Sequence, residues 1–250
     1  MPRYFLSLKY KGTRYAGFQI QDNAATIQGH IERAILIYFR EKIVLTGSSR
    51  TDAGVHANSN FFHFDTEKTL SADFIYHVNA ILPGDIALTG LYQVPEESHC
   101  RFDALARSYK YIIYSNKDPF LEDRGWYYPY PMEQAALDAV AKQVIGTHDF
   151  TSFAKKRTQV YTHICTINRC AWVRNDQGWS FEVEGNRFLR GMVRALVGTM
   201  VKVGRGRMEI DDFRKVMLSK DSAMADFSAP AHGLILDEVI YPDFLSTFMH

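Results

Sequence analysis

The order in which strands and helices are predicted along this chain constrains its fold more than any other feature of the sequence. Alternating or helically spaced apolar residues divide the first half into six elements. They are strands near residues 3–10, 43–46, 60–64 and 86–92, a helix after Thr26 and a helix from Ser71 to Ile81. Their order, strand-helix-strand-strand-helix-strand, is the split βαβ arrangement of ferredoxin-like folds.

The second half has a similar order, with an additional short helix before its last strand and no clear repeat of the residues themselves. Its elements are predicted as strands near 108–114, 163–173, 179–184 and 234–240, and helices near 133–145, 188–203 and 210–218. We therefore predict an α+β fold with two ferredoxin-like halves, residues 1–104 and 105–250.

Composition limits the class of protein. With 250 residues, 46% of them hydrophobic, the chain can bury one large core or two modest ones. No segment approaches the roughly 20 apolar residues of a membrane helix, and the N-terminus lacks the apolar core of a signal peptide. The three cysteines, Cys100, Cys165 and Cys170, cannot all pair and show no Cys-x-x-Cys spacing. We expect reduced thiols in a cytoplasmic protein.

The segment Gly47–Ala57, GSSRTDAGVHA, joins two of the predicted strands and carries chemically active side chains. Small residues there let the backbone turn sharply or approach a ligand closely. Arg50 stands two residues before Asp52, and a nearby cation keeps a carboxylate ionised even when it is partly dry. Covalent catalysis by a carboxylate needs such a group.

Two other interpretations of this segment stay open on the residues alone. Asp-Ala-Gly is a common turn sequence, because Asp bonds local backbone and Gly takes positive φ, and spacing alone favours this simple turn. A metal site at Asp52 and His56 is the third interpretation, but it lacks further ligands at a recognised spacing.

Basic residues gather in local patches, although the net charge of the chain is only +1. Six of them and no acid occur between Arg187 and Arg207, and the spacing of Arg187, Arg190 and Arg194 predicts one shared helix face. A solvated helix face is the alternative. Several patches in a chain with 14% aromatic residues favour nucleic acid as the partner. The candidate RNA-binding residues are Arg187, Arg190, Arg205, Lys155, Lys156 and Arg157.

Two tyrosines alternate along one predicted strand and so share a face of the sheet. An aromatic ring on such a face can stack on an unpaired base, but it can equally be a core residue. Tyr109 and Tyr111 are the pair in question.

The string RTDAGVH, residues 50–56, resembles the signature of the tRNA pseudouridine synthase A family. Further blocks resemble that family in the same order and extend over nearly the whole chain. They comprise residues 10–19, 78–83, 85–86, 101–102, 107–111, 149–153, 188–194 and 233–236.

The resemblance implies both an architecture and a reaction. The two halves would merge their mostly antiparallel sheets into one large sheet, with the active cleft between them. The reaction would isomerise uridine to pseudouridine in tRNA, at positions thirty-eight to forty of the anticodon stem-loop, without a cofactor or metal. The family also implies a homodimer that binds tRNA.

The resemblance assigns roles to five residues. Asp52 matches the essential catalytic aspartate, and Arg194 matches the arginine that pairs with it. Tyr109 matches the tyrosine that stacks on the base, with Tyr111 expected to be structural. Two others, Arg50 and Leu236, match an arginine that displaces the target nucleotide and an apolar wall residue near the base.

Some positions depart from the family pattern and leave the choice of uridine open. They are Lys11, Ser48, Ser49, Gly191 and Ala195. A paralogue that modifies a different uridine, a non-catalytic RNA-binding protein and a metal-assisted hydrolase are the alternatives. Asp52 could attack the ribose, attack the uracil ring or act as a base at the ribose.

Overall fold

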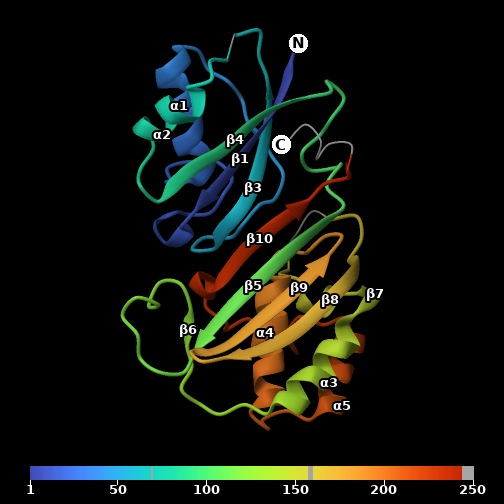
Figure 1. Ribbon diagram of the computed structural model, residues 1–250. Helices are drawn as coiled ribbons and strands as arrows, with labels where there is room; N and C mark the ends of the chain where they lie inside the picture. Colours follow the sequence, from blue (N-terminus) through green and yellow to red (C-terminus); the bar gives the residue numbers. More distant parts are fainter. Residues whose placement is uncertain (69, 157–159, 244–250) are drawn as a thin grey trace. The chain divides into compact units, whose positions relative to one another are not determined.

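The computed structural model describes residues 1–68, 70–156 and 160–243 (Figure 1). Its contacts divide the chain into two compact units. The first unit contains Met1–Leu105 and Leu236–His250, and the second contains Ala106–Ile235. The first boundary lies one residue from the predicted division. The residues from Leu236 on, however, belong to the first unit, whereas the predicted halves place them in the second.

The first unit has the predicted element order. Its elements are β1 (Arg3–Tyr10), the 3-10 helix η1 (Gly12–Arg14), α1 (Ile27–Phe39), β2 (Thr46–Gly47), β3 (His56–Asp65), α2 (Phe74–Ile81) and β4 (Ile86–Val94). The strands form an antiparallel sheet in which β1 lies between β4 and β3, and β2 pairs with β3. The last strand, β10 (Leu234–Ile240), begins in the second unit and continues in the first.

The helices of this unit begin where local hydrogen bonds allow. The Thr26 hydroxyl accepts a hydrogen bond from the Gly29 amide at 3.2 Å, which confirms the predicted cap of α1. By contrast, α2 begins at Phe74 rather than after Ser71. The intervening residues form a turn in which the Phe74 amide donates to the Ser71 carbonyl, so the first predicted turn of this helix is absent.

Aromatic residues fill the core of the first unit. Phe18, just after η1, stacks on Phe62 of β3 with 4.6 Å between ring centroids. Phe5 and Leu6 of β1 have no exposed surface. Because Phe18 precedes α1 and Phe62 lies mid-strand, their contact ties the 11–26 segment to the sheet.

The second unit contains the remaining elements. They are β5 (Ala106–Tyr114), β6 (Trp126–Tyr127), α3 (Gln134–Val144), β7 (Gly146–Asp149), the 3-10 helix η2 (Thr151–Phe153), β8 (Ile164–Asn175), β9 (Gly178–Gly185), α4 (Met192–Gly204), α5 (Ile210–Ser219) and the 3-10 helix η3 (Ala231–Gly233). The sheet order is β5-β9-β8-β7 with antiparallel pairing, and β6 runs parallel to the end of β5. Helix α3 packs against both α4 and β8 (Figure 1).

Helix α4 begins four residues later than predicted. Gly191 precedes it with a φ of +76°, a left-handed conformation that cannot continue an α-helix. Arg187 and Arg190 therefore lie before the helix, and the prediction that they share a helix face with Arg194 is wrong.

The fold class is α+β with mostly antiparallel strands, which confirms the predicted class. None of the helices in the described part of the chain has the length and apolar character needed to cross a membrane.

Candidate active site

The loop Gly47–Ala57 of the first unit links β2 to β3, and neighbouring segments fix its backbone at several points. Its backbone hydrogen bonds run from Ser48 N to Phe61 O (2.8 Å), Phe18 N to Thr51 O (3.1 Å), Gly54 N to Tyr15 O (3.3 Å) and Val55 N to Asp52 O (3.1 Å). A surface loop with this many bonds to the core holds one conformation.

A buried amide ties the same loop to the sheet. Asn60 of β3 has no exposed surface; its Nδ2 donates to the Ser49 carbonyl at 2.8 Å and its Oδ1 accepts from the Ser49 amide at 3.3 Å. The Nδ2 also lies 3.3 Å from the hydroxyl of Tyr10, which shares a 2.8 Å hydrogen bond with the Thr51 hydroxyl. Thus β1 and β3 both position the residues on either side of Arg50.

Two glycines let the chain pass close to this loop. A Cβ on Gly12 would lie 1.9 Å from the Val55 carbonyl oxygen, and the Gly12 amide donates to Nδ1 of His56 at 2.9 Å. Gly17 has a φ of +112°, and a Cβ there would lie 3.0 Å from the Thr51 carbonyl oxygen.

These contacts give His56 a structural partner. It is buried, and its Nδ1 accepts the Gly12 amide. Within the described ranges, the one group of three potential metal ligands includes neither residue. The metal-site interpretation of this loop therefore has no support in the structure.

The loop presents its two charged side chains differently. Asp52 is half-buried, whereas Arg50 is exposed. The backbone of Asp52 is fixed by its own carbonyl, which accepts the Val55 amide and closes a turn. A partly exposed carboxylate on a fixed backbone can reach a bound substrate while keeping its position.

The tyrosines of β5 in the second unit have different surroundings. Tyr109 is buried, and its ring lies edge-on to Phe188 with 5.0 Å between centroids. Tyr111 is fully buried and donates its hydroxyl to the Pro230 carbonyl at 2.8 Å. Burial raises the pKa of Tyr111 far above its ordinary value, so this hydroxyl stays protonated. Its surroundings agree with the structural role expected for it.

Arg194 lies in the first turn of α4 and is held by a backbone carbonyl. Its Nε donates to Ala229 O at 2.7 Å. Because Tyr111 binds the next carbonyl, of Pro230, the two side chains together fix the segment that leads into η3 and β10. Leu236, two residues into β10, is fully buried.

The five residues to which the resemblance assigned roles are divided between the units. Asp52, Arg50 and Leu236 belong to the first, and Tyr109 and Arg194 belong to the second. The predicted pairing of Asp52 with Arg194 therefore stays a prediction.

Some of the candidate RNA-binding residues come together in the second unit. The Lys155 amide donates to the Arg190 carbonyl at 2.9 Å, so these two segments adjoin. Lys155 and Lys156 line an open hollow of about 300 Å³, together with Phe227. Arg187 is half-buried, Arg190 is exposed, and Arg157 lies outside the described residues.

Arg205 has aromatic neighbours that the sequence did not reveal. Its guanidinium lies 4.2 Å from the ring centroid of Tyr130 and 5.6 Å from that of Tyr128, and its Nη1 lies 3.3 Å from the Tyr128 hydroxyl. Cation–π contacts of this kind hold the side chain in place. The richness of residues 119–131 in tyrosine and proline was the available signal.

Comparison with known proteins identifies the family of this chain. A family model described as tRNA pseudouridine synthase matches residues 7–103 and 140–242, which include the Asp52 loop, Arg194 and Leu236. The chain belongs to the tRNA pseudouridine synthase family. It is accordingly an isomerase of the pseudouridine synthase class, and tRNA is the substrate of this family.

Individual relatives match over nearly their whole length. The chain is 42% identical to tRNA pseudouridine synthase A of Parabacteroides distasonis, with 97% of each chain covered. It is 41% identical to the protein of the same name from Bacteroides fragilis, with 96% of each covered. For the Staphylococcus aureus protein of that name the identity is 36%, over 95% of this chain and 90% of the relative.

Proposed function

We propose that this chain isomerises uridine at positions thirty-eight to forty of the tRNA anticodon stem-loop, with Asp52 as the catalytic nucleophile. The observation that carries the proposal is the half-buried Asp52 on a loop that β1, β3 and the 11–26 segment hold in one conformation. A nucleophile must be kept within a fraction of an ångström of its productive position. A loop that only binds a ligand does not need to be held so firmly.

The reaction moves one bond and conserves redox state. The glycosidic bond between the ribose and the base nitrogen breaks, a bond from the ribose to carbon 5 of the same uracil forms, the proton on carbon 5 leaves, and the released base nitrogen gains a proton. Asp52 can attack the ribose, attack the ring at carbon 6 or remove a ribose proton. All three routes use an ionised carboxylate and none uses a redox cofactor or a phosphoryl donor.

Arg194 and Tyr109 of the second unit, with Arg50 and Leu236 of the first, complete the proposed site. Arg194 uses one of its five N–H donors in the hydrogen bond to the Ala229 carbonyl. A bidentate pairing with the Asp52 carboxylate needs two more donors, so one guanidinium can make both interactions. Tyr109 stacks on the detached uracil, Leu236 forms an apolar wall, and Arg50 helps to displace the nucleotide from its stack.

The basic residues form the rest of the proposed tRNA surface. Exposed Arg190 and Lys156 bind phosphates, and Lys155 contributes from the adjoining hollow. Arg187 and Arg205 extend this surface, and Arg157, outside the described residues, is proposed as a further contact. The proposal also includes that two copies of this chain form a homodimer and that the protein is located in the cytoplasm.

Tritium release tests the proposal directly. Transcripts of tRNA that carry uridine labelled at carbon 5 release tritium when that carbon gains its bond to the ribose. We expect release with the wild type, and a rate at least about a thousandfold lower with Asp52→Asn, which keeps the side-chain shape but removes the charge. Binding of tRNA by the variant should stay close to that of the wild type.

The possible results separate the alternatives. Substantial release by Asp52→Asn would contradict the nucleophile assignment. Binding without release by the wild type, on any tRNA, would support a non-catalytic RNA-binding protein. Release from a uridine outside positions thirty-eight to forty, located by mapping the modified nucleotide, would show a paralogue with a different target.

A further inference from the structure

A second group of reactive side chains lies in the first unit, outside the 47–57 loop. It consists of His63, His99 and Cys100, whose potential ligand atoms all lie within 4.8 Å of one another. Within the described ranges, no other three histidine, cysteine or acidic side chains converge in this way. His63 and Cys100 are buried, and His99 is half-buried.

The sheet and one rigid turn build this group. His63 lies on β3, where it is paired with Thr46 of β2. His99 and Cys100 lie in the turn after β4. The turn is closed on itself, since the His99 amide donates to Asp103 Oδ2 at 2.7 Å. It is also fastened to β1, because Arg3 Nη1 donates to the Ser98 carbonyl at 2.8 Å.

We propose that His63, His99 and Cys100 bind a zinc ion. Two imidazoles and one thiolate form a borderline-soft donor set, which suits zinc and is unsuited to calcium or magnesium. Bonds of about 2.0–2.3 Å to nitrogen and sulfur place the ligand atoms of a tetrahedral site roughly 3.3–3.8 Å apart. Nδ1 of His63 and Sγ of Cys100 are already 3.2 Å apart, and the same Nδ1 accepts the Cys100 amide at 3.3 Å. All three ligand atoms lie within 4.8 Å of one another, so the site closes when the longer separations shorten by about 1 Å. A water molecule takes the fourth position.

Zinc binding exchanges a few local hydrogen bonds for metal bonds. The Cys100 thiol, which now donates to the Thr46 carbonyl at 3.2 Å, releases its proton to solvent as the zinc–sulfur bond forms. Nδ1 of His99 accepts the Arg101 amide at 3.1 Å, and that contact is lost when the ring turns to the metal. A structural zinc site contributes far more free energy than these hydrogen bonds do. No electron is transferred.

The charges around the group are compatible with a divalent cation. Arg3, the nearby guanidinium, is neutralised by Asp65 through two hydrogen bonds of 2.8 Å each. Asp103 adds a negative charge beside His99. Arg101 adds a positive charge on the same turn, so the two cations, Arg3 and Arg101, are matched in number by Asp65 and Asp103.

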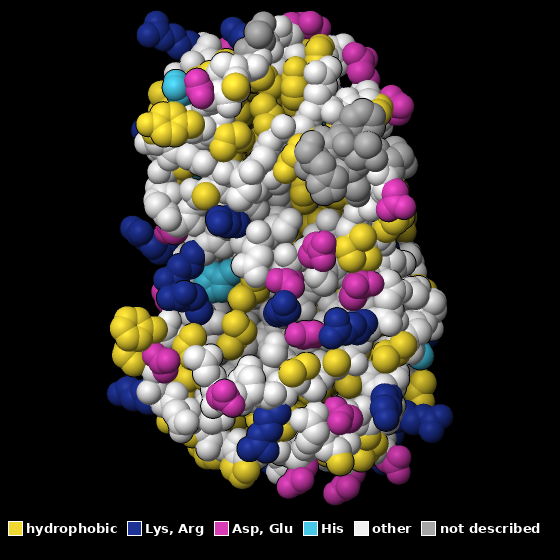
Figure 2. Space-filling model, viewed as in Figure 1, with side chains coloured by type: hydrophobic (Ala, Val, Ile, Leu, Met, Phe, Trp, Pro, Cys, Tyr) yellow, Lys and Arg dark blue, Asp and Glu magenta, His cyan; other side chains and the backbone are white. Residues whose placement is uncertain are grey.

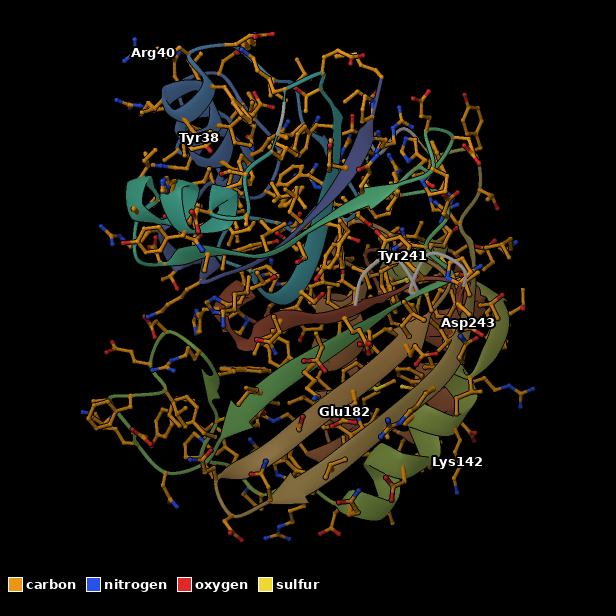
Figure 3. All side chains as sticks on the ribbon, turned by 45° about the horizontal axis from the view of Figure 1, so that its top comes forward. Tyr38, Arg40, Lys142, Glu182, Tyr241 and Asp243 are labelled. Carbon is orange, nitrogen blue, oxygen red and sulfur yellow. The ribbon has the colours of Figure 1, made fainter. Side chains whose placement is uncertain are left out.

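The site adjoins the base of the catalytic loop. The Tyr241 hydroxyl (labelled in Figure 3) donates to the Cys100 carbonyl and lies 3.3 Å from the Ser48 hydroxyl. Thr46, paired with His63, immediately precedes the loop. Bound zinc therefore holds β2, β3 and the 95–103 turn together where the loop begins, which makes it a structural metal rather than a participant in the isomerisation.

Titration of the metal-free, reduced, full-length protein with zinc chloride tests the proposal, with a chromophoric chelator as competitor. We expect one zinc per chain and a thermal midpoint that rises with zinc concentration. Cobalt(II) as a substitute should give tetrahedral absorption bands and a thiolate-to-cobalt charge-transfer band. Cys100→Ser and His99→Gln should each weaken zinc binding at least tenfold. The matched controls Cys165→Ser and His148→Gln, in the second unit, should bind as the wild type does.

Three results would overturn the site. They are no zinc bound by the wild type, equal binding by His99→Gln, and a cobalt spectrum without the thiolate band. If Cys100→Ser does not fold, His99→Gln and the cobalt spectrum of the wild type decide the question. Asp52→Asn should bind zinc normally, so failure of the zinc site and failure of the proposed isomerisation are separate outcomes.

Discussion

The loop 47–57 of the first unit and the basic segment 187–207 of the second are held in contrasting ways. The loop has backbone hydrogen bonds to two neighbouring segments, β3 and residues 11–26, and the buried side-chain amide of Asn60 also binds its backbone. The basic segment fixes only some of its charges, such as Arg194 on Ala229, and leaves Arg190 exposed. The difference fits the proposed roles, since a reacting carboxylate needs one geometry, whereas contacts to phosphates tolerate several.

The two surfaces also differ in how charge is distributed. On the face shown in Figure 2, basic and acidic side chains are interspersed, as expected for a chain with a net charge of +1. The basic segment itself contains no acid from Arg187 to Arg207, and Asp226 from outside it pairs with Lys202 at 2.9 Å. The contacts of the loop lie within the fold, whereas the basic side chains are proposed to contact a partner. We therefore expect that removing a contact of the loop lowers stability and that removing a basic side chain weakens only binding.

Asn60→Ala is expected to have the largest effect on folding. It leaves the amide and carbonyl of Ser49 without their partner in a buried site, so the free energy of unfolding should fall by about 3 kcal/mol. Chemical denaturation measures this change. Asn58→Ala is the matched control, since exposed Asn58 only binds Asp237, and it should lose less than about 1 kcal/mol. Equal losses in the two variants would contradict the special role of the buried amide.

Acid should loosen the base of the same loop. Burial, with His99 and Arg3 nearby, lowers the pKa of His63 from 6.5 to about 4. Below pH 6.5 the unfolded chain binds a proton that folded His63 does not, so stability falls as the pH decreases from 6.5 to about 4. The loss reaches up to about 3 kcal/mol.

The metal-free protein and its His63→Gln variant make this measurable. Denaturation at a series of pH values should show a shallower decline for the variant within that window, whatever its stability at neutral pH. Parallel curves for the two proteins would show that His63 is not the group that titrates.

Gly17→Ala should have an intermediate effect. The substitution puts a Cβ at positive φ and 3.0 Å from the Thr51 carbonyl oxygen, so the loop or the 11–26 segment must move. We expect a loss of about 1–2 kcal/mol and a lower rate of tritium release. Gly84→Ala is the control, since a Cβ there meets no atom within 4 Å. A normal rate in Gly17→Ala would show that the carboxylate tolerates a displaced loop.

Arg190→Ala should have the smallest effect on folding, within about 0.5 kcal/mol. Binding to tRNA should nevertheless weaken, and the slope of log affinity against log salt should fall by about 1. Filter binding at several salt concentrations measures both quantities. Arg33→Ala on α1, also exposed, is the control and should leave the slope unchanged. An unchanged slope in Arg190→Ala would remove this residue from the tRNA surface.

Local patterns predicted most elements of the fold. The cap at Thr26 and the apolar periodicity of α1 act over a few residues, so they can be read directly from the sequence. The start of α4 was predicted wrongly, because apolar spacing continues through residues 188–191 while Gly191 adopts a left-handed conformation. Periodicity does not reveal the sign of φ at a glycine.

The sequence also identified the motif around Asp52 but not the contacts that support it. Arg50, Asp52 and His56 lie within seven residues, so the motif is visible without a fold. Asn60 appeared as the first residue of an apolar strand, and only the pairing of strands shows that its amide binds the Ser49 backbone. Likewise, the sequence predicted Arg205 as a candidate RNA-binding residue. It did not reveal the position of its guanidinium over Tyr130, which depends on the path of a distant loop.

The sequence by itself determined the order of the elements, the motif at residues 50–56 and the family, since each is written in neighbouring residues or in blocks of fixed order. Only the tertiary structure decided which distant groups meet. His63 and Cys100 are 37 residues apart and Ser48 and Tyr241 are 193 apart, yet strand pairing and one closed turn bring each pair into contact. The physical reason is that local propensities act over one or two turns of chain, whereas these contacts form only when the sheet register is set.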